Sequence, residues 1–267
     1  RFFEDRLRML RAFRFASRFE FAIEPETQEA IRENADKLFP AVAMERVWQE
    51  FNKMSTYPRF DQALIDMHRL TLLDVIFPEI VGMHMKEMRQ RVNHFSFFPS
   101  HAPTILYVME ILFTLPTEQK IDITKRLKAS NKDCKLIEYM DMLNDSVIEE
   151  EQGAKIDLHR WATLLAHSDR EMCIQILAAR RDDNQRNEFL RRYADRYKQL
   201  EIHIERMKSG KPLVTAALLQ QQGIPAGKQM GRLLKEAEKI AVSENWNEPI
   251  PILTQLSKHP LWRGEET

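Results

Sequence analysis

The spacing of apolar residues constrains the fold of this chain more than any other feature. Apolar side chains recur every three or four residues in segment after segment, which is the period of an amphipathic helix. No segment alternates apolar and polar residues between hairpin turns, as a half-buried strand would. Only seven of the 267 residues are glycine, while 43% are hydrophobic and 30% are charged. We therefore expect an all-α protein with an ample core.

Residues 1–20 form a strongly basic stretch, with six arginines against three carboxylates in a chain of zero formal net charge. On a helical wheel, one side carries Phe2, Met9, Leu10, Phe13 and Ala16, and the other carries Arg8, Arg11, Arg14 and Arg18. Asp5 precedes Arg8 by three residues, so on a helix an acceptor-only carboxylate would adjoin a donor-only guanidinium. Such a mixed edge can read the edge of a nucleobase, and a solvated surface helix with weak ion pairs is the alternative.

Several motifs in the first 80 residues resemble a known family in order and spacing. EDRLRMLRAFRF at residues 4–15 resembles the EDxxR-LRAxRF motif of the class II tRNA nucleotidyltransferases, the bacterial CCA-adding enzymes and the related poly(A) polymerases. The likeness continues through FAIEPETQEAI at residues 21–31, ERVWQE at 45–50 and LDVIFPEI at 73–80. It implies an all-α neck, body and tail, which we expect over residues 1–55, 56–152 and 153–267.

The resemblance assigns roles to individual residues of the first motif. It implies that Asp5 and Arg8 read the Watson–Crick edge of an incoming CTP or ATP. Arg11 and Arg14 would bind the nucleotide or a terminal RNA phosphate, and Glu4 would orient its neighbours. We therefore predict a nucleotide-binding site on the first helix.

The same resemblance gives the next motif a supporting role. Residues 44–54 have the period of a helix, with Val47, Phe51 and Met54 spaced to pack inward. In the family this segment is thought to brace the nucleotide-reading helix, which makes Glu45, Arg46 and Glu50 supporting residues here. From the pattern alone, a plain helix with a charged first turn is equally possible.

Further helices are expected over residues 25–38, 59–73, 104–115, 131–151, 158–166, 168–181 and 184–209, with one more beginning at Thr117. Residues 82–100 favour a flexible connection that carries Lys86, Arg89 and Arg91 near RNA. This connection also contains three methionines and two histidines, but the methionines lie among charged residues, so we expect no metal site there.

Two segments of the second half are candidates for RNA contact. The helix over residues 184–209 gathers arginines in its first half, and we predict that Arg191, Arg192 and Arg196 contact the phosphate backbone, with a solvated helix as the alternative. Lys228 lies in a glycine-rich segment that resembles the tail of CCA-adding enzymes, which supports the tRNA elbow. This segment is not a Walker loop, because its spacing is one residue short and no Ser or Thr follows the lysine.

The metal-binding chemistry that the family uses is absent from this sequence. Family members transfer a nucleoside monophosphate with two metal ions bound by carboxylates of a β-sheet head. No Asp-x-Asp pair occurs and no glycine precedes Gly82, so we expect the head, with its magnesium, to lie N-terminal to Arg1. We assign no catalytic residue and no metal ligand, and expect this chain to be inactive alone. Cys134 and Cys173 are too few for a disulfide framework and are interpreted as reduced thiols of a cytoplasmic protein.

The leading hypothesis is the RNA-binding and nucleotide-selecting part of a tRNA nucleotidyltransferase, with CTP and ATP as substrates. Its expected partner is tRNA or another RNA 3′ end, and neither DNA nor a membrane. The same part of a poly(A) polymerase, a non-catalytic helical RNA-binding module and a structural adaptor are the alternatives.

Overall fold

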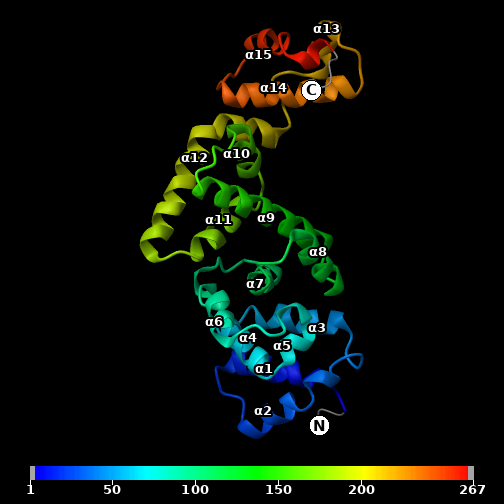
Figure 1. Ribbon diagram of the computed structural model, residues 1–267, viewed down its shortest axis with the longest axis vertical. Helices are drawn as coiled ribbons and strands as arrows, with labels where there is room; N and C mark the ends of the chain where they lie inside the picture. The colour runs from blue at the N-terminus through cyan, green and yellow to red at the C-terminus, as the bar shows by residue number, and fades with distance from the viewer. Residues whose placement is uncertain (1–3, 264–267) are drawn as a thin grey trace. The chain divides into compact units, whose positions relative to one another are not determined.

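The computed structural model describes residues 4–263, and these residues form helices joined by turns, with no strand among them (Figure 1). The expected all-α class is confirmed. Phe2, which the helical wheel places on the apolar side, lies outside the described residues. No helix in the described part of the chain is long and apolar enough to cross a membrane.

The chain divides into two compact units. The first comprises residues up to Met142 together with Gln175–Asp182, and the second comprises Leu143–Ile174 together with the residues from Asp183 onward. The α-helices of the first unit are α1 (Arg8–Phe19), α2 (Pro25–Arg32), α3 (Met44–Met54), α4 (Phe60–Arg69), α5 (Leu72–Ile76), α6 (Met85–Val92), α7 (Thr104–Ile111) and α8 (Thr117–Arg126). Its short 3₁₀ helices are η1 (Ala35–Lys37), η2 (Pro78–Ile80) and η3 (Phe95–Phe97).

The second unit contains the remaining helices. These are α10 (Leu158–Leu165), α12 (Asp183–Ser209), α13 (Ala216–Gln221), α14 (Lys228–Ser243), α15 (Pro249–Leu256) and the 3₁₀ helix η4 (Pro260–Arg263). Helices α9 (Asn131–Glu151) and α11 (Arg170–Ala179) each include residues of both units. The division into a neck, a body and a tail stays a prediction.

Helix α1 begins at Arg8, later than the sequence pattern indicates, so Asp5 does not lie on the helix with Arg8. Asp5 lies in the turn before α1, where its Oδ1 accepts the backbone N–H of Leu7 at 3.1 Å. An aspartate side chain that bonds to the backbone two residues later favours a turn over a helix. The expectation that these two side chains are helical neighbours is therefore wrong.

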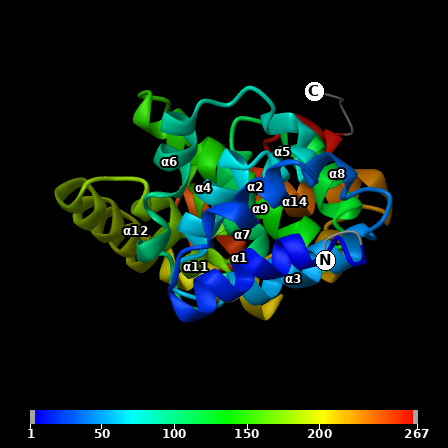
Figure 2. The same ribbon diagram turned by 90° about the horizontal axis from the view of Figure 1, so that it is seen from below.

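The apolar side of α1 packs against α3 and α4 in the first unit. Met9, Leu10 and Phe13 are buried, as predicted, and so are the three inward positions of α3 (Val47, Phe51, Met54). Figure 2 shows α1 and α3 side by side. Phe51 meets Phe60 and Phe77 edge to face, with ring centroids 6.3 and 5.9 Å apart. This core fixes the relative position of the two helices that carry the candidate site.

Two expected helices are interrupted. The segment 25–38 forms α2 and then the short η1, and the segment 59–73 forms α4 and then α5. The second break occurs at Thr71, whose φ of 61° ends the α-helical path before α5 starts. A left-handed residue of this kind interrupts a helix without disturbing the apolar spacing on either side of it.

The expected flexible connection over residues 82–100 is wrong, because the segment forms α6 and η3. Arg91 is buried, and its guanidinium donates to the carbonyl oxygen of Ile111 and to Glu87. Phe95 and Phe98 pack on Tyr107, with ring centroids 5.0 and 4.8 Å from it. Contacts with α7 therefore order the segment, and the Arg91 side chain is buried and hydrogen-bonded within the first unit.

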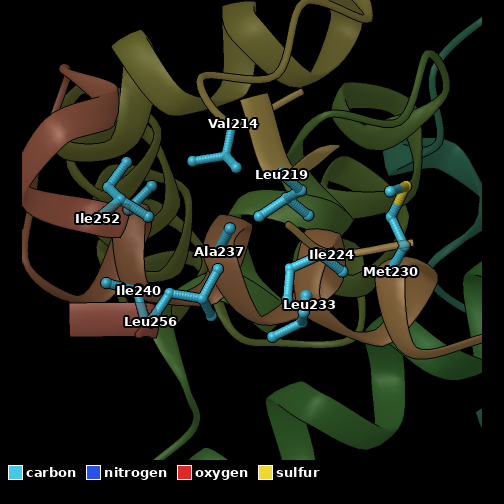
Figure 3. Packing of buried hydrophobic residues seen from close by; sticks show 10 residues of the cluster. Val214, Leu219, Ile224, Met230, Leu233, Ala237, Ile240, Ile252 and Leu256 are labelled. Carbon is cyan, nitrogen blue, oxygen red and sulfur yellow. The ribbon is translucent and has the colours of Figure 1, made fainter. Parts of the chain in front are cut away.

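The second unit has its own apolar cores. Helix α12 buries Phe189, Tyr193, Leu200 and Ile204. Trp161 of α10 lies against Tyr193, with ring centroids 5.4 Å apart. Figure 3 shows a second core, to which α13 contributes Leu219, α14 contributes Leu233, and α15 contributes Leu256.

A buried carboxylate joins three segments of the first unit. Glu110 of α7 is 4% exposed and lies 2.9 Å from Nε2 of His94. Arg180 donates to both of its oxygens, from Nε at 3.1 Å and from Nη2 at 2.5 Å. Burial by itself would raise the pKa of Glu110, but Arg180 and His94 outweigh burial and lower this pKa below its ordinary value.

The lowered pKa of Glu110 makes the stability of the first unit sensitive to acid. A carboxyl group whose folded pKa is below its unfolded pKa stabilises above the unfolded value, and that stability is lost as pH falls through the folded value. We expect Glu110→Gln to lower the unfolding free energy at pH 7 by about 1.5–3 kcal/mol, because charge-assisted hydrogen bonds are lost. The difference in unfolding free energy between the wild type and Glu110→Gln, measured by urea unfolding, should decrease as the pH falls from 7 to 3. Glu29→Gln, in an exposed ion pair with Arg32, is the control, and a pH-independent difference would contradict the assignment.

Candidate functional site

The predicted nucleotide-binding and supporting residues converge on the start of α1 and on α3. We call this group the arginine cluster: Asp5, Arg8, Arg11, Arg14, Arg46 and Glu50. Residues 8, 11 and 14 recur every three positions along α1, and residues 46 and 50 are one turn apart on α3. Because α1 packs on α3, the two motifs meet although about 40 residues separate them.

Glu50 is the centre of the cluster. Its side chain is 3% exposed and accepts a hydrogen bond from Nε of Arg14 at 2.6 Å. Arg11 Nε lies 3.9 Å away and Lys53 Nζ lies 3.5 Å away. A buried carboxylate is tolerated only when it is paired and hydrogen-bonded. Glu50 therefore fixes the guanidinium of Arg14 and draws Arg11 toward α3.

Asp5 lies at the edge of this cluster. Its Oδ2 is 3.7 Å from Nη1 of Arg11, and its Oδ1 is 3.9 Å from Nη2 of Arg46. These are ion pairs rather than hydrogen bonds, since both distances exceed hydrogen-bond length. The Leu7 N–H also donates to Oδ1. The carboxylate is thus oriented and remains an acceptor beside several guanidinium donors.

Arg8 and Glu4 form the outer part of the group. Nη1 of Arg8 lies 2.7 Å from Oε2 of Glu4, and the side chains are 43% and 68% exposed. An exposed pair of this kind contributes little to stability, so a ligand can replace it at small cost. The position is consistent with the predicted orienting role of Glu4, which stays a prediction.

The supporting residues differ in what they contact. Arg46 pairs with Asp5, and Glu50 binds Arg14, whereas Glu45 is an exposed residue in the first turn of α3. An acidic residue there suits the unpaired N–H groups of the helix start. Sequence reasoning missed Lys53, whose only signal is its position one turn after Glu50.

The predicted RNA-binding arginines of α12 fall into two groups within the second unit. Arg191 and Arg192 are exposed, and Arg192 lies 3.9 Å from Glu188. Arg196 instead binds Glu150 through both Nη groups, at 3.0 and 2.6 Å, and its guanidinium carbon lies 4.4 Å from the Trp161 ring centroid. Its guanidinium joins α12 to α9 and α10, so its predicted contact with RNA would have to coexist with these bonds.

Lys228 and Tyr193 have different surroundings in the second unit. Lys228 is the exposed first residue of α14, directly after Gly227. Burial and the nearby Glu150 carboxylate raise the pKa of Tyr193, whose hydroxyl donates to Glu150 at 3.2 Å. Tyr193 is therefore a neutral hydrogen-bond donor of the Glu150–Arg196 pair.

The arginine cluster can bind an anion or a planar polar group, and it lacks a metal site of its own. In the part of the chain that the structure describes, no group of three or more His, Cys, Asp or Glu side chains could bind a metal ion. The cluster offers guanidinium donors and an oriented carboxylate acceptor instead. Such groups can recognise a planar polar or anionic ligand.

Comparisons with known proteins agree with the expected resemblance. Residues 20–83 match a family model described as the probable RNA and SrmB-binding site of polymerase A. A CCA-adding enzyme of Lactobacillus johnsonii is 28% identical over 248 residues, which cover 91% of this chain and 56% of that protein. The chain spans between about a third and three fifths of the length of the curated relatives it matches.

Solved structures show the same fold. The CCA-adding enzyme of Bacillus stearothermophilus in complex with CTP matches 99% of this chain and 64% of that one, with a TM-score of 0.75 and 22% identity. The Thermotoga maritima CCA-adding enzyme complexed with tRNA matches 96% of this chain and 61% of that one, with a TM-score of 0.59 and 16% identity.

The all-α fold and the first-helix motif are thus similar to those of the class II nucleotidyltransferases. In sequence and in fold the chain is similar to the CCA-adding enzymes over nearly its whole length, as the motifs of residues 4–80 predict.

The role of Glu50 in the cluster can be tested through stability. We expect Glu50→Ala to lower the unfolding free energy by about 3–5 kcal/mol, because it leaves Arg14 without its buried partner. Glu29→Ala removes an exposed carboxylate, 2.8 Å from Arg32, and should cost less than about 1 kcal/mol. Urea denaturation followed by circular dichroism measures both variants. Equal losses would show that Glu50 does not anchor the cluster.

Proposed function

We propose that this chain is the nucleotide-selecting and RNA-binding part of a template-independent tRNA nucleotidyltransferase, which adds CMP and AMP to tRNA 3′ ends. The observation that carries the proposal is the arginine cluster, centred on buried Glu50, in a chain similar to CCA-adding enzymes. Two further findings support it: the solved relatives include one with CTP and one with tRNA.

The donor and acceptor pattern of the cluster suits cytosine and adenine. Each of these bases carries an exocyclic amino donor next to a ring nitrogen acceptor on its Watson–Crick edge. The Asp5 carboxylate would accept from the amino group, and the Arg8 guanidinium would donate to the ring nitrogen. Uracil presents the reverse order of donor and acceptor, so the same pair would reject it. One site could therefore select both CTP and ATP.

The inner arginines would bind phosphate. Glu50 uses Nε of Arg14, so in the proposed complex the two Nη groups of Arg14 point to a nucleotide or terminal RNA phosphate together with Arg11. A guanidinium offers several donors in a fixed fork, so one edge can bind Glu50 while another binds a phosphate oxygen. Arg46 and Glu45 would support the site from α3, as Glu4 would from the turn before α1.

We further propose that the chemistry itself is supplied from outside this chain. Among the described residues, no group of three or more His, Cys, Asp or Glu side chains could hold a metal ion, and we assign no step of the transfer to these residues. Magnesium would be bound by a head domain N-terminal to Arg1, and the chain alone would not incorporate CMP or AMP. A poly(A) polymerase is the less favoured version of this proposal, because the named relatives are CCA-adding enzymes.

The partner of the second unit would be the body of tRNA. Arg191, Arg192 and Lys228 would contact the phosphate backbone, and Arg196 would position α12 as well as approach the RNA. Residues 1–55, 56–152 and 153–267 would act as neck, body and tail in a cytoplasmic protein that binds neither DNA nor a membrane.

Binding of tRNA across a salt series tests the proposal. We expect the chain to bind tRNA more tightly than unstructured RNA of the same length, with an affinity that falls steeply as salt rises. The double variant Arg191→Ala, Arg192→Ala should reduce the slope of log affinity against log salt concentration by about one to two. Arg32→Ala, on α2 of the first unit, is the control. Equal binding of every RNA would favour the poly(A) polymerase version, and no binding would refute the RNA-binding function.

Nucleotide selection tests the arginine cluster. In the enzyme that contains this chain, we expect Arg8→Ala to reduce CMP and AMP incorporation by about ten- to hundredfold, which is the loss of one or two charge-assisted hydrogen bonds. Arg32→Ala, which removes a similarly exposed arginine, should leave the rate unchanged. Incorporation kinetics with radiolabelled CTP and ATP measure the effect. An unchanged rate in Arg8→Ala would rule out the base-reading role.

A further inference from the structure

Three exposed phenylalanines continue the side of α1 that carries the arginine cluster. Phe15 follows Arg11 by four residues and Phe19 follows Phe15 by four, so all three lie on one side of the helix. Phe21 follows Glu20, the residue that caps the end of the helix. We call Phe15, Phe19 and Phe21 the aromatic ladder; they are 39%, 58% and 50% exposed.

The ladder rings are ordered and flanked by positive charge. The Phe15 and Phe19 centroids are 6.1 Å apart at 15°, and those of Phe19 and Phe21 are 6.0 Å apart at 5°. The guanidinium carbon of Arg14 lies 4.4 Å from the Phe15 centroid, and that of Arg18 lies 5.2 Å from the Phe19 centroid. Aromatic faces interleaved with cations are typical of surfaces that bind unpaired nucleotides.

The last ring of the ladder lines a pocket within the first unit. The pocket has a volume of about 370 Å³. Besides Ser17 of α1, its polar side chains come from α2, α4 and the residue before α4: Gln28, Arg59, Gln62, Asp66 and Arg69. The volume is within the range of small-molecule sites.

Hydrogen bonds order the polar wall of this pocket. Gln62 donates to Asp66 at 3.0 Å, and Arg69 donates to Asp66 at 2.9 Å and to Gln28 at 3.1 Å. Arg59 uses one Nη group on the carbonyl oxygen of Glu20. Within residues 4–263, the other nitrogens of Arg59 and the Oε1 of Gln62 have no protein partner. The wall thus presents a guanidinium donor and an amide acceptor.

We propose that the aromatic ladder and this pocket form a subsite for an unpaired nucleobase of the RNA substrate. The base stacks on Phe21, while Gln62 Oε1 accepts from its edge and Arg59 donates to it. Arg18 and Arg69 compensate the flanking phosphates. The subsite rests on the proposed function, and it specifies where the single-stranded end of the RNA lies: along α1, beyond the nucleotide-reading arginines.

Two observations favour RNA over other occupants. The family model, described as a probable RNA and SrmB-binding site, covers residues 20–83, which include these residues of the pocket wall: Phe21, Gln28, Arg59, Gln62, Asp66 and Arg69. The ladder begins about 10 Å along the helix axis from Arg8, since seven residues at 1.5 Å each separate Arg8 from Phe15. An RNA strand whose 3′ end lies beside the incoming nucleotide can therefore reach the aromatic ladder.

A thermodynamic cycle tests the subsite. The RNA is a tRNA acceptor minihelix with an unpaired 3′ overhang, in which abasic nucleotides replace each overhang base in turn. We expect one abasic position to weaken binding to the wild-type chain by about 5- to 150-fold, the usual contribution of one stacked base. Phe21→Leu and Gln62→Ala should each weaken binding of the intact overhang and then show little further loss with the abasic RNA.

The control is Phe97→Leu, the same substitution at another phenylalanine that is 50% exposed. It should behave as wild type, and thermal unfolding of all variants verifies that they fold. If the wild type and the variants all lose the same affinity on abasic substitution, the proposed subsite is wrong, while the proposed function stands. If Phe21→Leu weakens binding of free CTP or ATP and not of the overhang, the pocket binds a free nucleotide and the RNA assignment is wrong. If the wild-type chain binds no tRNA, the proposed function and the subsite both fail.

Discussion

The contact between Glu50 and Arg14 is the interaction on which the candidate site depends. It joins α3 to α1 through a carboxylate that is 3% exposed and a guanidinium nitrogen 2.6 Å away. A charge buried to this degree is costly unless a partner and hydrogen bonds compensate it. Phe51, the next residue of α3, packs edge to face against Phe60 and Phe77 in the core. Packing and ion pairing therefore require the same register of the two helices, and that register places Arg46 beside Asp5.

Ion pairs between a carboxylate and an arginine of another segment recur elsewhere in the chain. Glu110 binds Arg180 in the first unit, and in the second unit Glu150 binds Arg196 and Glu238 binds Arg206. In each case one buried or partly buried carboxylate fixes an arginine from another segment of the chain. Such pairs add orientation more than net stability, because desolvation offsets much of the Coulomb attraction. Their value here is geometric, since a rigid arginine can present its remaining donors in one direction.

Local signals in the sequence were sufficient for most helices but not for the site geometry. Helix α3 was predicted over its observed bounds because its apolar period, Val47, Phe51 and Met54, is regular. The position of Asp5 could not be predicted in this way. It lies in a turn, where its side chain accepts from the Leu7 N–H, and such a turn has no periodic pattern in the sequence. The order of residues 82–100 depends on Arg91 reaching Ile111, a contact 20 residues away in sequence that no local pattern contains. Tertiary contacts of this kind decide the structure of a segment whose own pattern is weak.

The arginines show why composition could indicate a basic surface without locating it. The formal net charge of the chain is zero, so a local excess of positive charge requires that the balancing carboxylates lie elsewhere on the protein. Arg196 binds Glu150, while Arg191, five residues earlier on the same helix, is exposed. The sequence pattern treats the two residues alike, because both belong to the same run. Only the packing of α12 on α10, which brings Trp161 under the Arg196 guanidinium, separates a structural arginine from one that can meet a phosphate.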